Sequence, residues 1–224
     1  MNRVVFDIET LAFPVEELDE KQQEYLFRFA TTEEERIDAV QKLSLNPFTA
    51  QIIAIGMVNP ESNQGKVYYQ APGKNAELIE DGLVELVPLA EEGILEEFWK
   101  TIAHYTQFIT FNGRGFDCPF LMLRSAVLGI RPSRNLIPYR YNAKEHCDLM
   151  DQLAYYGAFR RFSLDFYCKG FGIKSPKEEG ITGLDMGPLY KEGRYREIAE
   201  YCLRDVRATS TLFHRWQTLL SFEK

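Results

Sequence analysis

Two carboxylates, Asp7 and Glu9, lie within the apolar N-terminal segment VVFDIETL, residues 4–11. Because side chains alternate along a strand, both acids are expected on one face of it, with apolar side chains on the other. Paired carboxylate oxygens are suited to binding a divalent metal ion. A D-x-E tripeptide also fits a strand whose polar face meets water, so other residues must distinguish the two interpretations.

A tyrosine and an aspartate four residues apart, Tyr201 and Asp205, lie in the segment REIAEYCLRDVRATSTLF, residues 196–213. Its apolar residues recur at helical spacing, and the acid lies on or beside the resulting stripe. A buried carboxylate without a partner is unfavourable. Asp205 therefore requires a metal ion, a salt bridge or a hydrogen bond, for which Tyr201 is one candidate.

A fourth acid, Asp117, follows the predicted buried strand QFITFN, residues 107–112, and precedes a predicted helix with Pro119 in its first turn. Aspartate is a favoured helix cap, and capping alone would explain this position. Ligands of α/β proteins, however, commonly bind where the chain leaves the carboxyl ends of parallel strands. The sequence leaves both roles open for Asp117.

The three motifs together, D-x-E, N-x-x-x-F-D and Y-x-x-x-D in that order, resemble the DEDDy subgroup of 3′-to-5′ exonucleases. Within it, the chain looks most similar to the proofreading exonuclease domain of family-B DNA polymerases, from residue 4 to about residue 213. The resemblance implies an α/β fold of the ribonuclease H-like type, a mixed sheet flanked by helices. It also implies four metal-binding carboxylates and a catalytic tyrosine where the sister DEDDh subgroup has histidine: Asp7, Glu9, Asp117, Asp205 and Tyr201.

The resemblance implies a metal-dependent enzyme that hydrolyses single-stranded DNA from the 3′ end to nucleoside 5′-monophosphates. In two-metal chemistry, one ion activates the attacking water and the other stabilises the leaving 3′ oxygen. All-oxygen ligands favour Mg²⁺ or Mn²⁺, whereas zinc usually binds histidine or cysteine. Because a tyrosine hydroxyl has an ordinary pKa of about 10, we expect Tyr201 to orient the water by hydrogen bonding.

Three residues of the second motif are expected to contact the nucleic acid: Asn112, Arg114 and Phe116. Recognition is expected to be independent of sequence, through phosphate contacts and base stacking. Further candidates for these contacts are Arg160, Arg161, Lys169, Phe171, Lys174 and Lys177. His146 and Asp148 suggest another strand end that faces the site, although Asp148 would also suit the cap of a following helix.

Three alternatives remain open. An enzyme of the ribonuclease D type, which also uses tyrosine, would trim RNA 3′ ends. A non-catalytic protein of the same fold would bind nucleic acid only, although buried acids without a metal role would then be unfavourable. An endonuclease of the ribonuclease H type would cut circular substrates. We expect single-stranded nucleic acid as the partner, DNA rather than RNA.

The three motifs lie far apart in the sequence, so bringing them together requires a fold that joins distant segments. We expect a mixed sheet with helices packed on its faces. We expect strands at residues 4–8, 51–58, 66–70 and 107–112, a short extended piece at 146–149, and helices at 91–105, after Pro119 and through most of the C-terminal part. Residues 15–46 read as an acidic insertion whose helical pattern begins at TTEEER. We expect a single domain over residues 1–224 that includes this insertion.

The 224 residues carry a formal net charge of −7, which does not indicate a general nucleic-acid-binding protein. Residues 15–46 hold nine acids and four bases, whereas residues 131–177 hold nine bases and four acids. The bases of the second region would either attract an anion to one face of the protein or be ordinary solvent-exposed surface. The chain has no apolar run of membrane-spanning length, no export signal and no C-x-x-C pair, so we expect a cytoplasmic protein with reduced thiols.

Overall fold

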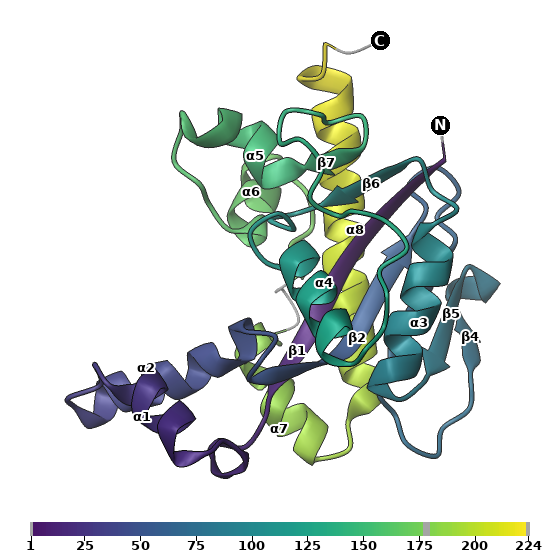
Figure 1. Cartoon of the computed structure of the whole chain (residues 1–224). Coiled ribbons are helices and arrows are strands. Elements are labelled where there is room, and N and C mark those ends of the chain that lie inside the picture. Colours follow the sequence, from purple (N-terminus) through teal and green to yellow (C-terminus); the bar gives the residue numbers. More distant parts are fainter. Residues whose placement is uncertain (1, 177–179, 223–224) are drawn as a thin grey trace.

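The computed structural model describes residues 2–176 and 180–222, and within them the chain forms a mixed sheet of seven strands in the order β4-β5-β3-β2-β1-β6-β7 (Figure 1). The strands are β1 (Arg3–Ala12), β2 (Ala50–Val58), β3 (Gly65–Tyr69), β4 (Glu77–Ile79), β5 (Val84–Pro88), β6 (Gln107–Thr110) and β7 (His146–Asp148). β1 is antiparallel to β2 and parallel to β6. The predicted mixed sheet is confirmed.

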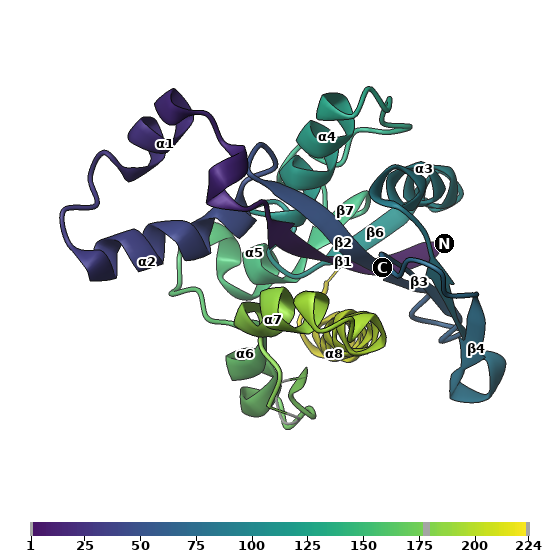
Figure 2. The ribbon, with the colours of Figure 1, turned by 90° about the horizontal axis from the view of Figure 1, so that it is seen from below.

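Helices cover both faces of this sheet, with α3 and α4 on one face and α7 and α8 on the other (Figure 2). The helices are α1 (Glu20–Phe27), α2 (Glu33–Lys42), α3 (Glu91–Ile102), α4 (Asp117–Val127), α5 (Leu149–Leu153), α6 (Leu164–Gly170), α7 (Met186–Lys191) and α8 (Tyr195–Leu219). α8 packs on β1, β2 and β3. This packing brings the C-terminal part of the chain beside its N-terminal strand.

The alternation of side chains in β1 divides the core in two. Phe6 packs on the face covered by α3, where its ring lies 5.4 Å from that of Phe98 in an edge-to-face arrangement. Val5 belongs to the core on the other face, beneath α8. Since Asp7 and Glu9 share a face with Val5, both acids are directed toward α8.

Residues 15–46 project from the body of the molecule as the two helices α1 and α2 (Figure 1). Both helices begin with a capping box, and in α2 the hydroxyl of Thr32 accepts a hydrogen bond from the Glu35 N–H at 3.2 Å. The helix start predicted at TTEEER is therefore confirmed. The insertion returns to β2 through the 3-10 turn Leu43–Leu45, which packs against β1.

The sequence does not predict two of the strands, β4 and β5, which lie in the segment ELIEDGLVELVP, residues 77–88. This segment carries four acids, and Glu80 and Asp81 adopt positive φ angles of 50° and 54° between the strands. Short strands interrupted by charged residues lack the apolar alternation on which strand prediction depends. β5 pairs with β3 in parallel and extends the sheet away from β1.

None of the helices in the described part of the chain combines the length and apolar character needed to cross a membrane.

Gly56 of β2 allows α8 to approach the sheet closely beside Asp7, the residue opposite it in β1. A Cβ atom at Gly56 would lie 2.9 Å from Cγ2 of Val206 and 3.1 Å from Sγ of Cys202. Gly56→Ala is therefore expected to lower the free energy of unfolding by about 1–3 kcal/mol, the usual effect of overpacking. Urea unfolding measures this loss. Gly183→Ala is the control, because its Cβ would meet nothing within 4 Å, and equal stability of the two variants would contradict the close approach.

Candidate active site

Four acids from three parts of the chain converge beside β1. Asp7 and Glu9 lie on β1, Asp117 begins α4 and Asp205 lies on α8. The carboxyl group of Asp7 forms a hydrogen bond with that of Asp117, and the Ile8 N–H donates to Asp117 Oδ1 at 3.1 Å. The structure thus brings together the four acids that the sequence motifs single out.

Asp117 is not the cap of α4. The N-cap residue is Phe116, and no side chain caps this helix end. Asp117 is 3% exposed, and its carboxylate accepts the backbone N–H of Ile8 from β1. The capping interpretation is therefore wrong, because the acid is turned toward β1 and the other carboxylates.

Burial and mutual repulsion disfavour ionisation in this cluster. Burial, reinforced by the charges of the other acids, raises the pKa of Asp7 and that of Glu9 well above their ordinary values. Burial also raises the pKa of Asp117 to about 7, although the hydrogen bond from the Ile8 N–H acts in the opposite direction. A bound cation would relieve this repulsion and favour the ionised carboxylates.

Tyr201 lies beside the acids and donates its hydroxyl hydrogen bond to Asp205, one helical turn further along α8. The side chain is 4% exposed. Burial, followed by the negative charge of Asp205, raises the pKa of the Tyr201 hydroxyl well above its ordinary value. The hydroxyl is therefore protonated at neutral pH in the metal-free chain, which suits hydrogen bonding.

Cys202 is a neighbour of the acids that the sequence did not single out. One ligand atom from each of Asp7, Glu9 and Cys202 lies within 4.8 Å of the others, and the thiol donates to the Asp7 carbonyl oxygen at 3.6 Å. Burial raises the pKa of the Cys202 thiol well above its usual range, so the thiol is protonated at neutral pH in the metal-free chain. The remaining oxygen ligands fit Mg²⁺ or Mn²⁺. In the sequence, Cys202 reads only as one member of an apolar helix stripe.

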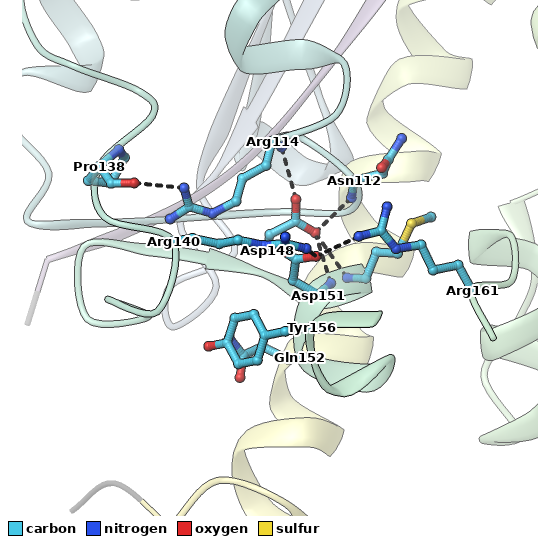
Figure 3. A network of polar contacts seen from close by, with 10 residues as sticks. Asn112, Arg114, Pro138, Arg140, Asp148, Asp151, Gln152, Tyr156 and Arg161 are labelled. Atoms are coloured by element: carbon cyan, nitrogen blue, oxygen red, sulfur yellow. Dashed lines mark hydrogen bonds and ion pairs between the residues drawn. The ribbon is translucent and has the colours of Figure 1, made fainter. Parts of the chain in front are cut away.

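Asp148, at the end of β7, holds the loop between β6 and α4 (Figure 3). Its carboxylate accepts the backbone N–H groups of Asn112 at 3.0 Å and Arg114 at 2.9 Å. It also caps α5 through the N–H groups of Met150 and Asp151, so the predicted cap is confirmed. Asp148 therefore fixes the loop that leads directly into the acid of α4.

Asn112, Arg114 and Phe116, the predicted substrate contacts, point in different directions from this loop. Asn112 has a φ of 62°, and Figure 3 shows its amide directed away from the acid that holds its backbone. The Arg114 guanidinium donates to the carbonyl oxygens of Pro138 at 2.8 Å and Tyr139 at 3.4 Å. Phe116 turns to the opposite side, into a groove beside β1.

This groove, of about 510 Å³, opens next to Glu9. One wall comes from the insertion, including Leu45, and another from the turn that carries Leu184. Phe116 also lines the groove, and an aromatic ring is a surface on which a base can stack. The insertion, to which the sequence assigns no role, therefore forms part of the surroundings of the acids.

Within residues 2–176 and 180–222, the other predicted phosphate and stacking contacts do not gather at the acids. Lys169 pairs with Asp165, Arg160 lies over the Phe162 ring and Arg161 pairs with Asp151. Lys174 lines a separate pocket, and Phe171 packs on the core beneath α8. Lys177 lies outside the described residues.

His146 faces the core and not the site, contrary to the expectation from the sequence. It is 1% exposed, its ring centroid lies 4.3 Å from that of Phe108, and Nε2 is 2.8 Å from Oγ1 of Thr110. His146 and Asp148 lie on the same face of β7 because side chains alternate along a strand. His146 is at the start of the strand, paired with Phe108, whereas Asp148 is at its end and reaches the backbone of Asn112 and Arg114.

Asp148→Ala is expected to lower activity by about 10- to 100-fold, the usual effect of removing a residue that orients a metal ligand. The loss follows because the N–H groups of Asn112 and Arg114 lose their acceptor and the loop before Asp117 loosens. The measurement is the Mn²⁺ concentration that gives half-maximal activity, which should rise. Ser163→Ala, which removes only the cap of α6, is the control. Equal metal requirements in the two variants would contradict the positioning role.

Comparison with known proteins identifies the family. Residues 45–221 match the family described as "Predicted 3'-5' exonuclease related to the exonuclease domain of PolB". The catalytic subunits A of DNA polymerase epsilon from Emericella nidulans and Aspergillus fumigatus are each 29% identical to the chain over 137 residues. That stretch is 56% of this chain and 6% of each relative, so the chain spans a small part of their length.

A solved structure has a similar fold: the family B DNA polymerase from the hyperthermophilic archaeon Pyrobaculum calidifontis matches with a TM-score of 0.61 and 16% identity. The match covers 96% of this chain and 24% of the polymerase chain. Asp7 and Glu9 precede the residues matched by the family, so geometry alone links them to the other acids. The match from residue 45 to residue 221 covers most of the chain, which therefore belongs to the family of predicted 3′-5′ exonucleases related to the exonuclease domain of PolB.

Proposed function

We propose that the protein is a metal-dependent 3′-to-5′ exonuclease that hydrolyses single-stranded DNA and releases nucleoside 5′-monophosphates. The observation that carries this proposal is the convergence of four acids beside β1, three of which have raised pKa values. Acids in such a cluster repel one another and favour a bound cation. Membership of the exonuclease family supports the class of reaction.

Asp7, Glu9, Asp117 and Asp205 would hold two divalent ions, Mg²⁺ or Mn²⁺, whose charge the four carboxylates balance. When bound, such ions lower the pKa of the attacking water and stabilise charge on the departing 3′ oxygen. The four carboxylates offer hard oxygen ligands, which Mg²⁺ and Mn²⁺ prefer. The oxygen ligands therefore support Mg²⁺ or Mn²⁺ over zinc.

The chain's own groups would orient the reactants. The Tyr201 hydroxyl donates a hydrogen bond to Asp205, which leaves the hydroxyl oxygen able to accept a hydrogen bond from the attacking water. The groove with Phe116 lies next to Glu9 and would receive the terminal nucleoside by stacking. A base can enter such a groove only when it is unpaired, which supports a single-stranded 3′ end as the substrate.

Tyr201→Phe tests the orienting role. It keeps the ring and removes the hydroxyl, so we expect kcat to fall by about 10- to 100-fold. Because no base is lost, the pH dependence of kcat should keep its shape. The measurement is the pH profile of both proteins between pH 6 and pH 9. A profile that loses an ionisation in the variant would instead assign proton transfer to the tyrosine.

The proposed function is tested with 5′-labelled linear DNA, a closed circular single strand and an RNA oligomer of the same sequence, each with Mg²⁺ or Mn²⁺. We expect stepwise shortening of linear DNA, an intact circle and slower loss of RNA. Preferred degradation of RNA would indicate an enzyme of the ribonuclease D type, which trims RNA 3′ ends. Cleavage of the circle would indicate an endonuclease, and binding without turnover would indicate a non-catalytic protein.

A further inference from the structure

A second pocket, of about 470 Å³, lies beside the loop that leads into the active site (Figure 3). Its charged lining residues are Arg114, Arg140, Asp148, Asp151 and Arg161. Arg140 and Arg161 are two of the nine bases of residues 131–177, and Arg114 precedes that region. The pocket is therefore a place where bases that are dispersed in the sequence gather in space.

Two of the arginines are held by one buried acid. Asp151, 5% exposed, accepts hydrogen bonds from Arg140 Nε at 2.9 Å and Nη2 at 2.7 Å, and from Arg161 Nη2 at 3.1 Å. Figure 3 shows both guanidinium groups directed at this carboxylate. The Arg140 and Arg161 side chains are nonetheless 43% and 48% exposed. Asp151 thus fixes both groups at the surface of the pocket.

The pocket has an excess of positive charge. Three guanidinium groups line it against two carboxylates, and the Asp148 carboxylate is occupied by backbone N–H groups. Each guanidinium has five N–H donors, and the bonds to Asp151 use two from Arg140 and one from Arg161. The planar donor pattern of arginine matches the oxygens of a phosphate group.

One loop connects this pocket with the active site. It supplies Asn112 and Arg114 to the pocket, Phe116 to the groove beside Glu9, and then Asp117 to the acid cluster. The chain from Asn112 to Asp117 can span at most about 18 Å, which is the length of a few nucleotides. A strand with its 3′ end at the acids can therefore reach the pocket with a phosphate further from that end.

We propose that Arg140 and Arg161, held by Asp151, bind a backbone phosphate of the substrate strand upstream of the nucleotide that is removed. This inference rests on the proposed function. Its physical basis is that a polyanion must be held close to a cluster of acids that repels it, and a fixed cationic pocket nearby supplies that attraction. The competing explanation is an ion-pair cluster that only joins α5 to the loops around it.

The test is equilibrium binding of a single-stranded DNA oligomer of about ten nucleotides to the full chain, with Mg²⁺ present and turnover blocked by Asp205→Asn. Arg161→Gln, Arg140→Gln and the double variant are compared over a range of salt concentrations. Arg161→Gln leaves the two-bond Arg140–Asp151 pair in place and so protects the fold. Arg196→Gln is the matched control, because Arg196 is 56% exposed and pairs with two acids far from this loop.

We expect each pocket variant to bind the oligomer about tenfold more weakly. Each lost phosphate contact should also flatten the slope of log binding constant against log salt by about 0.7, while Arg196→Gln changes neither quantity. A lower melting temperature with unchanged affinity and slope would overturn the inference in favour of an ion-pair cluster. Binding of inorganic phosphate that the double variant loses, with oligomer binding intact, would overturn it in favour of a free anion.

The two proposals fail in different ways. If the wild-type chain neither binds nor degrades single-stranded DNA or RNA, the proposed function and this inference fail together. If the wild-type chain degrades the oligomer and the pocket variants bind it as tightly as Asp205→Asn alone, only the inference fails.

Discussion

Asp205→Asn is expected to lower kcat on single-stranded DNA by about a thousandfold or more. The variant keeps the size of the side chain and removes one of the four charges that would hold the metal ions. Bound metal supplies several kcal/mol of transition-state stabilisation, and about 4 kcal/mol corresponds to about a thousandfold in rate. Asp205 is only partly buried, so the neutral side chain should not disturb the fold.

The measurement is the rate of single-nucleotide release from a 5′-labelled oligomer at saturating Mn²⁺. Glu200→Gln is the matched control: it neutralises another acid of α8, one that pairs with Arg196 outside the acid cluster. We expect wild-type kcat for the control. Equal losses in both variants would indicate a general effect of charge on α8 and would contradict the metal-binding role of Asp205.

The second large effect concerns the stability of the metal-free protein, which should fall as the pH rises. The pKa of Asp117 is about 7 in the folded chain, whereas the ordinary value for an aspartate, which applies to the unfolded chain, is 3.8. Between these values the folded state binds more protons than the unfolded state, so stability decreases with rising pH. For Asp117 alone the change is on the order of 4 kcal/mol from pH 4 to pH 8, and the raised pKa values of Asp7 and Glu9 act in the same direction.

Urea unfolding in EDTA at pH 5 and pH 8 measures this effect. We expect lower stability at pH 8, recovery of that stability when Mn²⁺ replaces EDTA, and a weaker pH dependence in Asp7→Asn. Asp7→Asn should also be more stable than the wild type at pH 8 without metal, because it removes one repelling charge. A metal-free protein that becomes more stable from pH 5 to pH 8 would contradict the proposed repulsion among the acids.

The faces on which the acids lie can be read from the sequence because they depend on local periodicity. The period of two in β1 puts Asp7 and Glu9 on one face, and the spacing of four in α8 puts Tyr201 beside Asp205. Local patterns of this kind need no knowledge of the rest of the fold. They do not show that these elements meet, and the convergence of the acids depends on how α8 packs on the sheet at Gly56.

Other features of the site could not be predicted because they depend on contacts between distant segments. Asp148 reads as a helix cap, and nothing nearby in the chain indicates that it also holds the backbone of Asn112 and Arg114. Arg140 and Arg161 are twenty-one positions apart and meet only through Asp151. Asp117 was ambiguous for the same reason, since its orientation is set by the Ile8 N–H of another element.

Restoration of activity by metal would show directly whether the four acids form a metal-dependent exonuclease site. The wild-type chain is stripped with EDTA, Mn²⁺ or Mg²⁺ is added in steps, and the lengths of a 5′-labelled single-stranded DNA oligomer are followed with time. We expect no turnover in EDTA and, with metal, a ladder that shortens one nucleotide at a time from the 3′ end. Turnover that persists in EDTA, or fragments that arise first from internal cleavage, would contradict it.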